Sequence, residues 1–190
     1  MLGIHLKNLK IDFTNNIKVA FLTFLGGFTV GIFTFTTLWS NGIMLGSFHE
    51  FFAAHGLGLQ SVLVVWIHGT IEISSIVIAG TAGFIMADGI LFPKTFTRMQ
   101  SFRRAAKDAA KIMVCLIPFF IIAGFLESYI THQLGAYINQ KPQLLPVWLS
   151  ILTLFLSVCL ILWYFVFLPF RLHKKGFQLK NEGIVSRLYE

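Results

Sequence analysis

Residues 66–83 read WIHGTIEISSIVIAGTAG, an apolar stretch in which His68 and Glu72 stand four positions apart. The stretch belongs to a hydrophobic segment at residues 60–86, which is longer than the roughly 20 residues that cross about 30 Å of hydrocarbon. Ionisable side chains are costly at that depth and usually face the interior of a helical bundle or a water-filled cavity. The segment therefore predicts a membrane-spanning helix whose polar side chains are sheltered by other parts of the protein.

The composition of the whole chain indicates a membrane protein. Of its 190 residues, 56% are hydrophobic and 12% are charged, whereas soluble domains carry about 25% charged residues. Four segments are apolar and long enough to span a bilayer, at residues 17–38, 60–86, 109–130 and 147–170. The expected fold is all-α, a single polytopic transmembrane helical bundle over residues 1–190 with about four membrane-spanning helices and short interfacial amphipathic helices.

The distribution of charge predicts an orientation for these spans. All Lys and Arg residues except Lys141 lie near the start of the first span, around the connector between the second and third, or after the fourth. An even number of crossings puts these three clusters on one side, and the positive-inside rule makes that side cytoplasmic. We therefore expect a multi-pass protein of the inner (plasma) membrane with both termini in the cytoplasm.

Two further segments have helical patterns at the predicted membrane surfaces. Residues 94–111 could form a basic helix facing anionic inner-leaflet lipids or a solvated connector, and residues 44–58 suggest a short amphipathic helix on the outer side. Lipid attraction and orientation account for the net charge of +7, so no nucleic-acid partner is expected. The predicted lipid-facing basic surface consists of Lys94, Arg98, Arg103, Arg104, Lys107 and Lys111.

Three ionisable residues within the spans form a predicted intramembrane polar cluster. On a helix, His68 and Glu72 project from one face, and Glu127, near the outer end of the third span, could meet His68 across the bundle. Three interpretations stay open: a polar clamp between helices, a site that binds a cation or relays a proton, and a metal-dependent hydrolase. The sequence HGTIE differs from the H-E-x-x-H zinc motif, so we expect no catalytic residues, no metal and no cofactor.

Small residues predict where helices approach each other closely. Gly27 and Gly31 have G-x-x-x-G spacing, and a second narrow surface contains Gly80 and Gly83. Small residues at such spacing let helix backbones pack tightly in a membrane. We expect these faces to pack helices within the chain, with a homo-oligomer as the alternative.

The chain resembles the stage II sporulation protein M family in four collinear stretches. They are NNIKVAFLTFLGG at 15–27, NGIMLG at 41–46, IHGTIEISSIVIAGTAGF at 67–84 and GFLESYIT at 124–131. The resemblance implies a multispanning membrane protein without an assigned catalytic activity, in a family that is similar to ABC-2 type permease subunits. The family pattern corresponds here to Asn16, Asn41, Gly42, His68, Gly69, Glu72, Gly80, Gly83 and Glu127.

The resemblance also implies a functional context. In spore-forming bacteria, the namesake of the family works with cell-wall-degrading partners during engulfment. We therefore expect a noncatalytic, sporulation-related type of membrane subunit that scaffolds or anchors a cell-envelope complex, with other envelope or membrane proteins as partners. The alternative is a permease-like or ion-coupled or proton-coupled transport element that uses His68, Glu72 and Glu127.

Overall fold

The computed structural model describes residues 2–127 and 147–174, and within those ranges the chain forms helices joined by short turns. By length and composition, three helical stretches in the described residues can cross a membrane, namely Val65–Leu91, Arg98–Leu126 and Ile151–Arg171. In chain order the elements are α1 (Leu2–Leu25), the 3-10 turn η1 (Gly26–Thr29), α2 (Ile32–Ala54), α3 (Gly58–Leu91), α4 (Arg98–Leu126), α6 (Val147–Leu162), the π-helical turn η3 (Trp163–Phe167) and α7 (Leu168–Lys174). The all-α membrane bundle expected from the sequence is confirmed.

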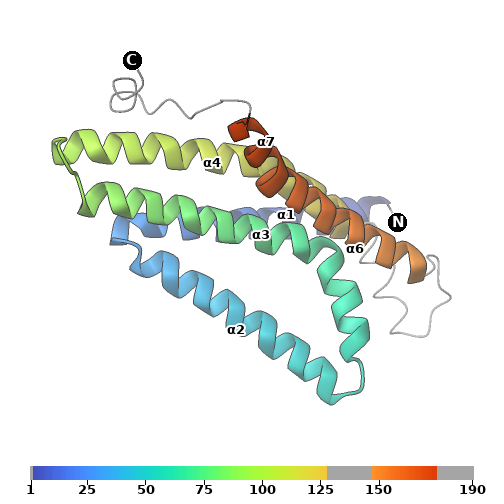
Figure 1. The fold of residues 1–190 in the computed structure, drawn as a ribbon. Helices are drawn as coiled ribbons and strands as arrows, with labels where there is room; N and C mark the ends of the chain where they lie inside the picture. The colour runs from blue at the N-terminus through green and yellow to red at the C-terminus, as the bar shows by residue number, and fades with distance from the viewer. Residues whose placement is uncertain (1, 128–146, 175–190) are drawn as a thin grey trace.

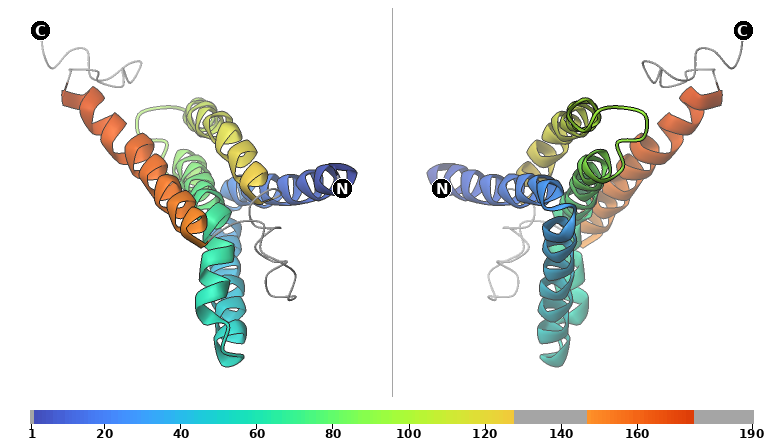
Figure 2. Two further views of the ribbon diagram at one scale, coloured as in Figure 1. Left: turned by 90° about the vertical axis from the view of Figure 1, so that its right-hand side faces the viewer. Right: turned by 90° about the vertical axis from the view of Figure 1, so that its left-hand side faces the viewer.

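Helix α3 is the central element of the bundle. It contacts α1, α2, α4 and α6. In Figure 1, α4 and most of α3 run alongside each other, and α6 crosses them at an angle. Figure 2 shows that α1 extends sideways from these helices toward its N-terminal end. The first part of α3 bends away and projects from the bundle together with α2 (Figures 1 and 2). The helix nevertheless continues unbroken from Gly58 to Leu91, so bending accommodates the unusual length of the second predicted span.

Small residues lie at the centre of the helix packing, and large apolar residues cover the outside. Ala79 and Ala82 of α3 and Ala109 and Ala123 of α4 are fully buried. Outward-facing side chains such as Phe155 remain highly exposed, as expected for a surface that faces lipid. Close backbone approach at alanine and glycine therefore holds the bundle together, since lipid tails leave no hydrophobic driving force between helices.

The first predicted span is wrong, because residues 17–38 do not form one helix. Helix α1 ends at Leu25, η1 follows, and the chain reverses at Val30 and Gly31, whose φ angles are 59° and 83°. The N–H of Val30 donates to the carbonyl of Gly27 at 3.1 Å and closes the turn. The chain thus forms a helical hairpin, α1–α2, whose apolar content is the same as that of a single continuous span.

The hairpin also changes the expected position of the N-terminus. Its turn lies beside the start of α4, where the rings of Phe28 and Phe102 are 5.8 Å apart. Figure 1 places the N-terminal end of α1 at the opposite end of the bundle from the 92–97 connector. We expected both termini on one side because we counted an even number of crossings. Since the first of these crossings is a hairpin, that count no longer supports the expectation.

The two predicted surface helices are parts of longer helices. Residues 44–54 continue α2, which ends at Ala54 before a short turn. Residues 98–111 of the basic segment form the first half of α4, which begins with a capping box between Thr97 and Gln100, and residues 94–97 precede the helix. Residues 128–130 of the third predicted span lie outside the described residues.

Candidate functional site

Helix α3 presents His68 and Glu72 toward the interior of the bundle. Because α-helical residues four positions apart lie one above the other, both side chains project from the same face. They are 9% and 7% exposed, so the protein shelters both from the surrounding membrane. The neighbouring residues of α3 are mostly apolar and belong to a membrane-spanning stretch, so the interior of the bundle is the only sheltered place for this polar pair.

Glu127 meets this pair from the end of α4. It is the C-cap residue of that helix, where its N–H bonds to the carbonyls of Ala123 and Gly124 and its backbone stays helical. The Nε2 atom of His68 lies 3.7 Å from Oε1 of Glu127. One ligand-type atom from each of His68, Glu72 and Glu127 lies within 4.8 Å of the other two. The three residues of the predicted polar cluster therefore share one site in the structure.

Apolar packing between α3 and α4 holds the cluster in this geometry. Ile71, between His68 and Glu72 on α3, packs with Phe119 and Ala123 of α4. Helix α6 covers the same region, where the Ser157 hydroxyl bonds to the carbonyls of Ile67 and Thr153 at 3.3 and 2.9 Å. The end of α4 is consequently fixed one helix turn beyond its contact with Ile71.

A cavity of about 300 Å³ adjoins His68 and Glu72 on the side of the α1–α2 hairpin. Asn16 of α1 and Asn41 of α2 contribute polar side chains to its wall, and Gly69 leaves room on the α3 side. The Nδ2 atom of Asn41 donates to the carbonyl of Thr37 at 2.8 Å. Six of the residues in the predicted family pattern line this cavity, namely Asn16, Asn41, Gly42, His68, Gly69 and Glu72.

Gly80 and Gly83 lie outside the cavity and serve close packing instead. A Cβ atom at Gly80 would lie 2.7 Å from the Leu38 side chain, and one at Gly83 would lie 2.6 Å from Oγ1 of Thr34. That hydroxyl donates to the Thr23 carbonyl at 2.8 Å and links α2 to α1. These glycines allow both arms of the hairpin to rest directly on α3.

The predicted pair of Gly27 and Gly31 does not form a continuous helix face. Gly27 lies in η1, where an added Cβ would approach the carbonyl of Gly83 and the Met86 side chain too closely. Gly31 follows the turn and adopts a left-handed backbone conformation, for which glycine is the favoured residue. Both residues therefore act inside the chain, one by close approach and the other by its backbone angles.

The cluster has the donor types of a cation site, and His68, Glu72 and Glu127 are the residues that could hold a metal. A transport pathway centred on Gly69 would be favoured by a discontinuous helix, because broken spans expose backbone dipoles to substrates at mid-membrane. Helix α3 is continuous through Gly69. The structure therefore does not favour the permease-like interpretation.

Sequence reasoning missed a second polar group, near the turn that joins α2 and α3. The indole N–H of Trp66 donates to Nε2 of His49 at 3.0 Å, while Nδ1 of His49 lies 3.1 Å from the Ser61 hydroxyl. Because an indole can only donate, Nε2 accepts and Nδ1 carries the proton. The Ser61 hydroxyl in turn bonds to the Gly58 carbonyl at 2.8 Å. Nothing in the spacing of His49 and Trp66 predicted this contact across the turn.

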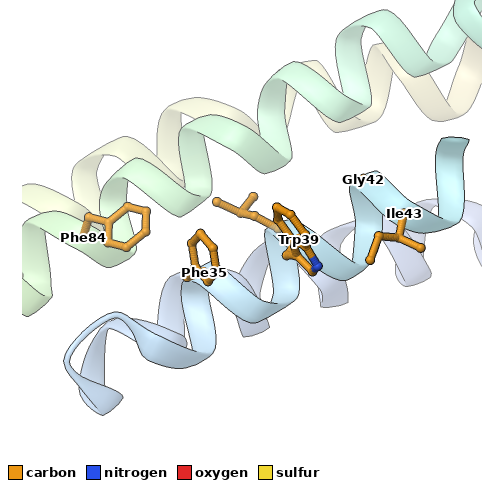
Figure 3. Close-up of a pocket in the computed structure, with 6 residues that line it drawn as sticks. Phe35, Trp39, Gly42, Ile43 and Phe84 are labelled. Carbon is orange, nitrogen blue, oxygen red and sulfur yellow. The ribbon is translucent and has the colours of Figure 1, made fainter.

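An open apolar groove lies between α2 and the C-terminal part of α3. Figure 3 shows Phe35, Trp39 and Ile43 along α2 opposite Phe84 of α3, and the groove has a volume of about 510 Å³. Gly42 forms part of its floor. The groove offers aromatic and aliphatic contacts but no charged side chain, so it suits an apolar occupant.

The predicted basic surface lies along the connector and the first turns of α4. Lys94, Arg98, Arg103, Lys107 and Lys111 are exposed, and Arg104 is half-buried. The Arg104 guanidinium lies over the Phe96 ring at 4.5 Å, and Lys111 pairs with Asp108 at 2.9 Å. Most of these charges thus remain available to a lipid surface.

Comparison with known proteins identifies one family that the chain resembles over most of its length. The sequence model of stage II sporulation protein M matches residues 5–132. An uncharacterized protein of Methanocaldococcus jannaschii is 29% identical over 140 residues, which are 70% of this chain and 79% of that relative. A second uncharacterized protein of the same organism is 25% identical over 147 residues, 69% of this chain and 64% of the relative. No solved structure matches the chain.

Proposed function

This chain belongs to the stage II sporulation protein M family, and we propose that it is a noncatalytic membrane subunit that scaffolds or anchors a cell-envelope complex. Its described helices include three that can cross a membrane, and their packed interior presents one small polar cluster. Such a subunit needs a rigid bundle and a surface on which another membrane protein can dock. The bundle around α3 supplies the first, and α2 supplies the second.

The observation that carries this proposal is an open glycine face on α2. Gly42 and Gly46 are one turn apart, and a Cβ added at either would meet no atom within 4 Å in the described part of the chain. At Gly27, Gly80 and Gly83, by contrast, a neighbouring element already occupies the space that a Cβ would take. Small residues at this spacing are typical of helix–helix contacts in membranes. The unfilled pair is therefore available to a helix of another protein.

The groove beside this face supports the same role. Phe35 and Trp39 of α2 lie on the same side of the helix as Gly42, and both are more than half exposed. Large aromatic side chains next to small ones present ridges and a hollow to an approaching helix. We propose that a transmembrane helix of a partner protein packs along Gly42 and Gly46 and against these rings.

The proposed setting is the plasma membrane, with the basic connector in the cytoplasm. Exposed Lys and Arg residues are spread over residues 94–111, and the last membrane-spanning stretch ends at Arg171, with Lys174 just beyond it. Two crossings, by α4 and by the α6–α7 stretch, return the chain to the side of the connector. Both basic groups then face anionic inner-leaflet lipids, as the positive-inside rule favours.

Purification of the full chain from native membranes in mild detergent tests the scaffold proposal. Wild-type protein should retain a membrane protein in a fixed ratio, and Gly42→Leu or Gly46→Leu should lose it because the leucine fills the contact face. Ser40→Leu is the matched control, since Ser40 is exposed and two residues before Gly42, on the opposite side of α2. Repeated recovery of the chain alone would overturn the proposal. Recovery of a homo-oligomer that the same two variants disrupt would assign the face to self-association instead.

A further inference from the structure

We propose that His68, Glu72 and Glu127 form a binding site for one divalent transition-metal ion, with Zn²⁺ as the best match. This inference does not rest on the scaffold role, although Gly42 lines both the cavity beside the cluster and the proposed docking face. The site lies inside the bundle, where α3 meets the C-terminal end of α4. It would give the polar cluster a ligand rather than a purely structural contact.

The donor set selects the class of metal. One imidazole and two carboxylates suit Zn²⁺ and related first-row ions, which accept nitrogen and oxygen ligands. Ca²⁺ and Mg²⁺ prefer six or more oxygen ligands, and an imidazole is a poor donor to them. Since His68 is one of the three ligand-type residues, the cluster favours a transition metal over either of those ions.

The distances are close to those of a coordinated ion. Two ligands that are each about 2.0–2.2 Å from a tetrahedral Zn²⁺ lie about 3.3–3.6 Å from each other. The Nε2 atom of His68 and Oε1 of Glu127 are 3.7 Å apart, and all three ligand-type atoms lie within 4.8 Å. Binding would require the carboxylate oxygens to move closer together than the 4.8 Å limit that the three atoms now satisfy. His68 and Glu72 cannot separate, because one helix carries both.

Charge supports a cation at the same position. Two carboxylates that share a small buried volume repel each other, and keeping each ionised away from water is costly. His68 and Glu72 are almost fully buried, and the Glu127 side chain is 25% exposed. A divalent cation offsets both negative charges at once. The ion would also bind the middle of α3 to the end of α4.

The neighbouring cavity completes the geometry of the site. Three protein ligands leave one tetrahedral position for water or another donor. The cavity of about 300 Å³ touches His68 and Glu72 and is lined on its far side by Asn16 and Asn41. A water in the fourth position would have amide groups within the same cavity as hydrogen-bond partners. The cavity therefore supplies room that a closed polar clamp between helices does not need.

Metal content of the purified full chain tests this inference. The protein carries a tag without histidine, Cys115 and Cys159 are replaced by serine to remove thiol ligands, and the sample is stripped with EDTA and reloaded with ZnCl₂. After desalting, elemental analysis should find about one Zn²⁺ per chain, and zinc should raise the melting temperature because it binds the folded state. His68→Ala and Glu72→Gln should weaken binding at least about 100-fold, since loss of a direct ligand exceeds the effect of an outer-shell change.

Two exposed residues of the same types provide matched controls. Glu50→Gln and His55→Ala change a carboxylate and an imidazole at the end of α2, where both side chains are exposed. Both variants should bind zinc as the wild type does. Equal zinc content in the site variants and these controls would overturn the inference.

Measurements on the parent protein keep the inference testable if a site variant does not fold. Co²⁺ loaded in place of Zn²⁺ should give the intense visible absorption of a tetrahedral site with nitrogen and oxygen ligands. A weak spectrum like that of hydrated Co²⁺, or no retained metal after desalting, would refute the site. Retention of Ca²⁺ with no retention of Zn²⁺ would refute the assignment to a transition metal.

Discussion

Replacing Gly83 by alanine should destabilise the chain, whereas the same replacement at Gly42 should not. At Gly83 the new Cβ would lie 2.6 Å from Oγ1 of Thr34 and 2.9 Å from the carbonyl oxygen of Thr23. The second of these atoms belongs to the backbone of α1 and cannot rotate away. At Gly42 a Cβ would meet nothing within 4 Å. The same substitution is thus made once at a tightly packed position and once at an open one.

The expected magnitude follows from two opposing effects. Alanine is favoured over glycine within a helix by up to about 1 kcal/mol at both positions. Overpacking at Gly83 costs about 1–3 kcal/mol, and disturbing the buried hydrogen bond from Thr34 to Thr23 adds about 1 kcal/mol. The Gly42→Ala variant should therefore exceed the Gly83→Ala variant by about 2–4 kcal/mol in unfolding free energy. At about 2–4 °C per kcal/mol, the two melting temperatures should differ by about 4–16 °C.

Thermal unfolding of both variants in the same detergent measures this difference. Wild-type protein should melt near or slightly below Gly42→Ala, and Gly83→Ala should melt clearly below both. Helical content by circular dichroism at low temperature shows whether each variant is folded before heating. Equal melting temperatures for the two variants would refute the close packing of α1 and α2 on α3 at Gly83.

Three further results are expected. In protein without its native cysteines, Val30→Cys should be labelled from the same side of the membrane as Thr95→Cys, because the hairpin turn lies beside the connector. Protection of Val30→Cys from the label would favour a continuous first span instead of the hairpin. Trp66→Phe should lower the free energy of unfolding by about 1 kcal/mol in the same melting assay, because it removes the N–H that donates to His49 and keeps an aromatic ring. An unchanged melting temperature would show that this hydrogen bond does not contribute to stability. Stabilisation by anionic over zwitterionic lipid should fall by about 2 kcal/mol in an Arg103→Gln, Lys107→Gln double variant, at about 1 kcal/mol for each charge, and an unaltered lipid effect would argue against the basic surface.

Much of the bundle was predictable because a bilayer permits few structures. Backbone groups in hydrocarbon must be satisfied internally, so a long apolar segment predicts a helix almost regardless of its detailed sequence. The second and third predicted spans correspond to α3 and α4, and the fourth corresponds to α6 and its continuation. Their ends differ from the prediction because helices continue beyond the apolar residues: the basic residues before Ala109 belong to α4, which begins only at the capping box of Thr97 and Gln100.

The first span could not be predicted from apolar length alone. Residues 17–38 are equally apolar as one crossing or as two arms of a hairpin, and the choice depends on contacts that form only in the folded chain. The decisive features are the left-handed conformations at Val30 and Gly31 and the close approach of Gly27 to Gly83. The pair Gly26–Gly27, followed by Gly31, was the available signal for a turn, and we interpreted it as a packing motif.

The candidate site was partly predictable for a different reason. The spacing of His68 and Glu72 places them on one helix face wherever the helix lies, so their proximity needed no tertiary information. Glu127 required only an estimate of depth in the neighbouring span. The His49–Trp66 contact depended on the turn between α2 and α3, which periodicity does not describe.

The hairpin gives the family pattern a physical meaning that its linear spacing hides. Asn16 and Asn41 are 25 positions apart in sequence, and a straight span between them would put them at different depths. Because α1 and α2 run in opposite directions from the turn, both asparagines reach the cavity beside His68 and Glu72. The same reversal brings Gly27 onto Gly83, so the packing glycines create the geometry in which the polar residues converge. The glycine and the polar parts of the pattern are therefore two requirements of one structure, a tightly seated hairpin and the cavity that it closes.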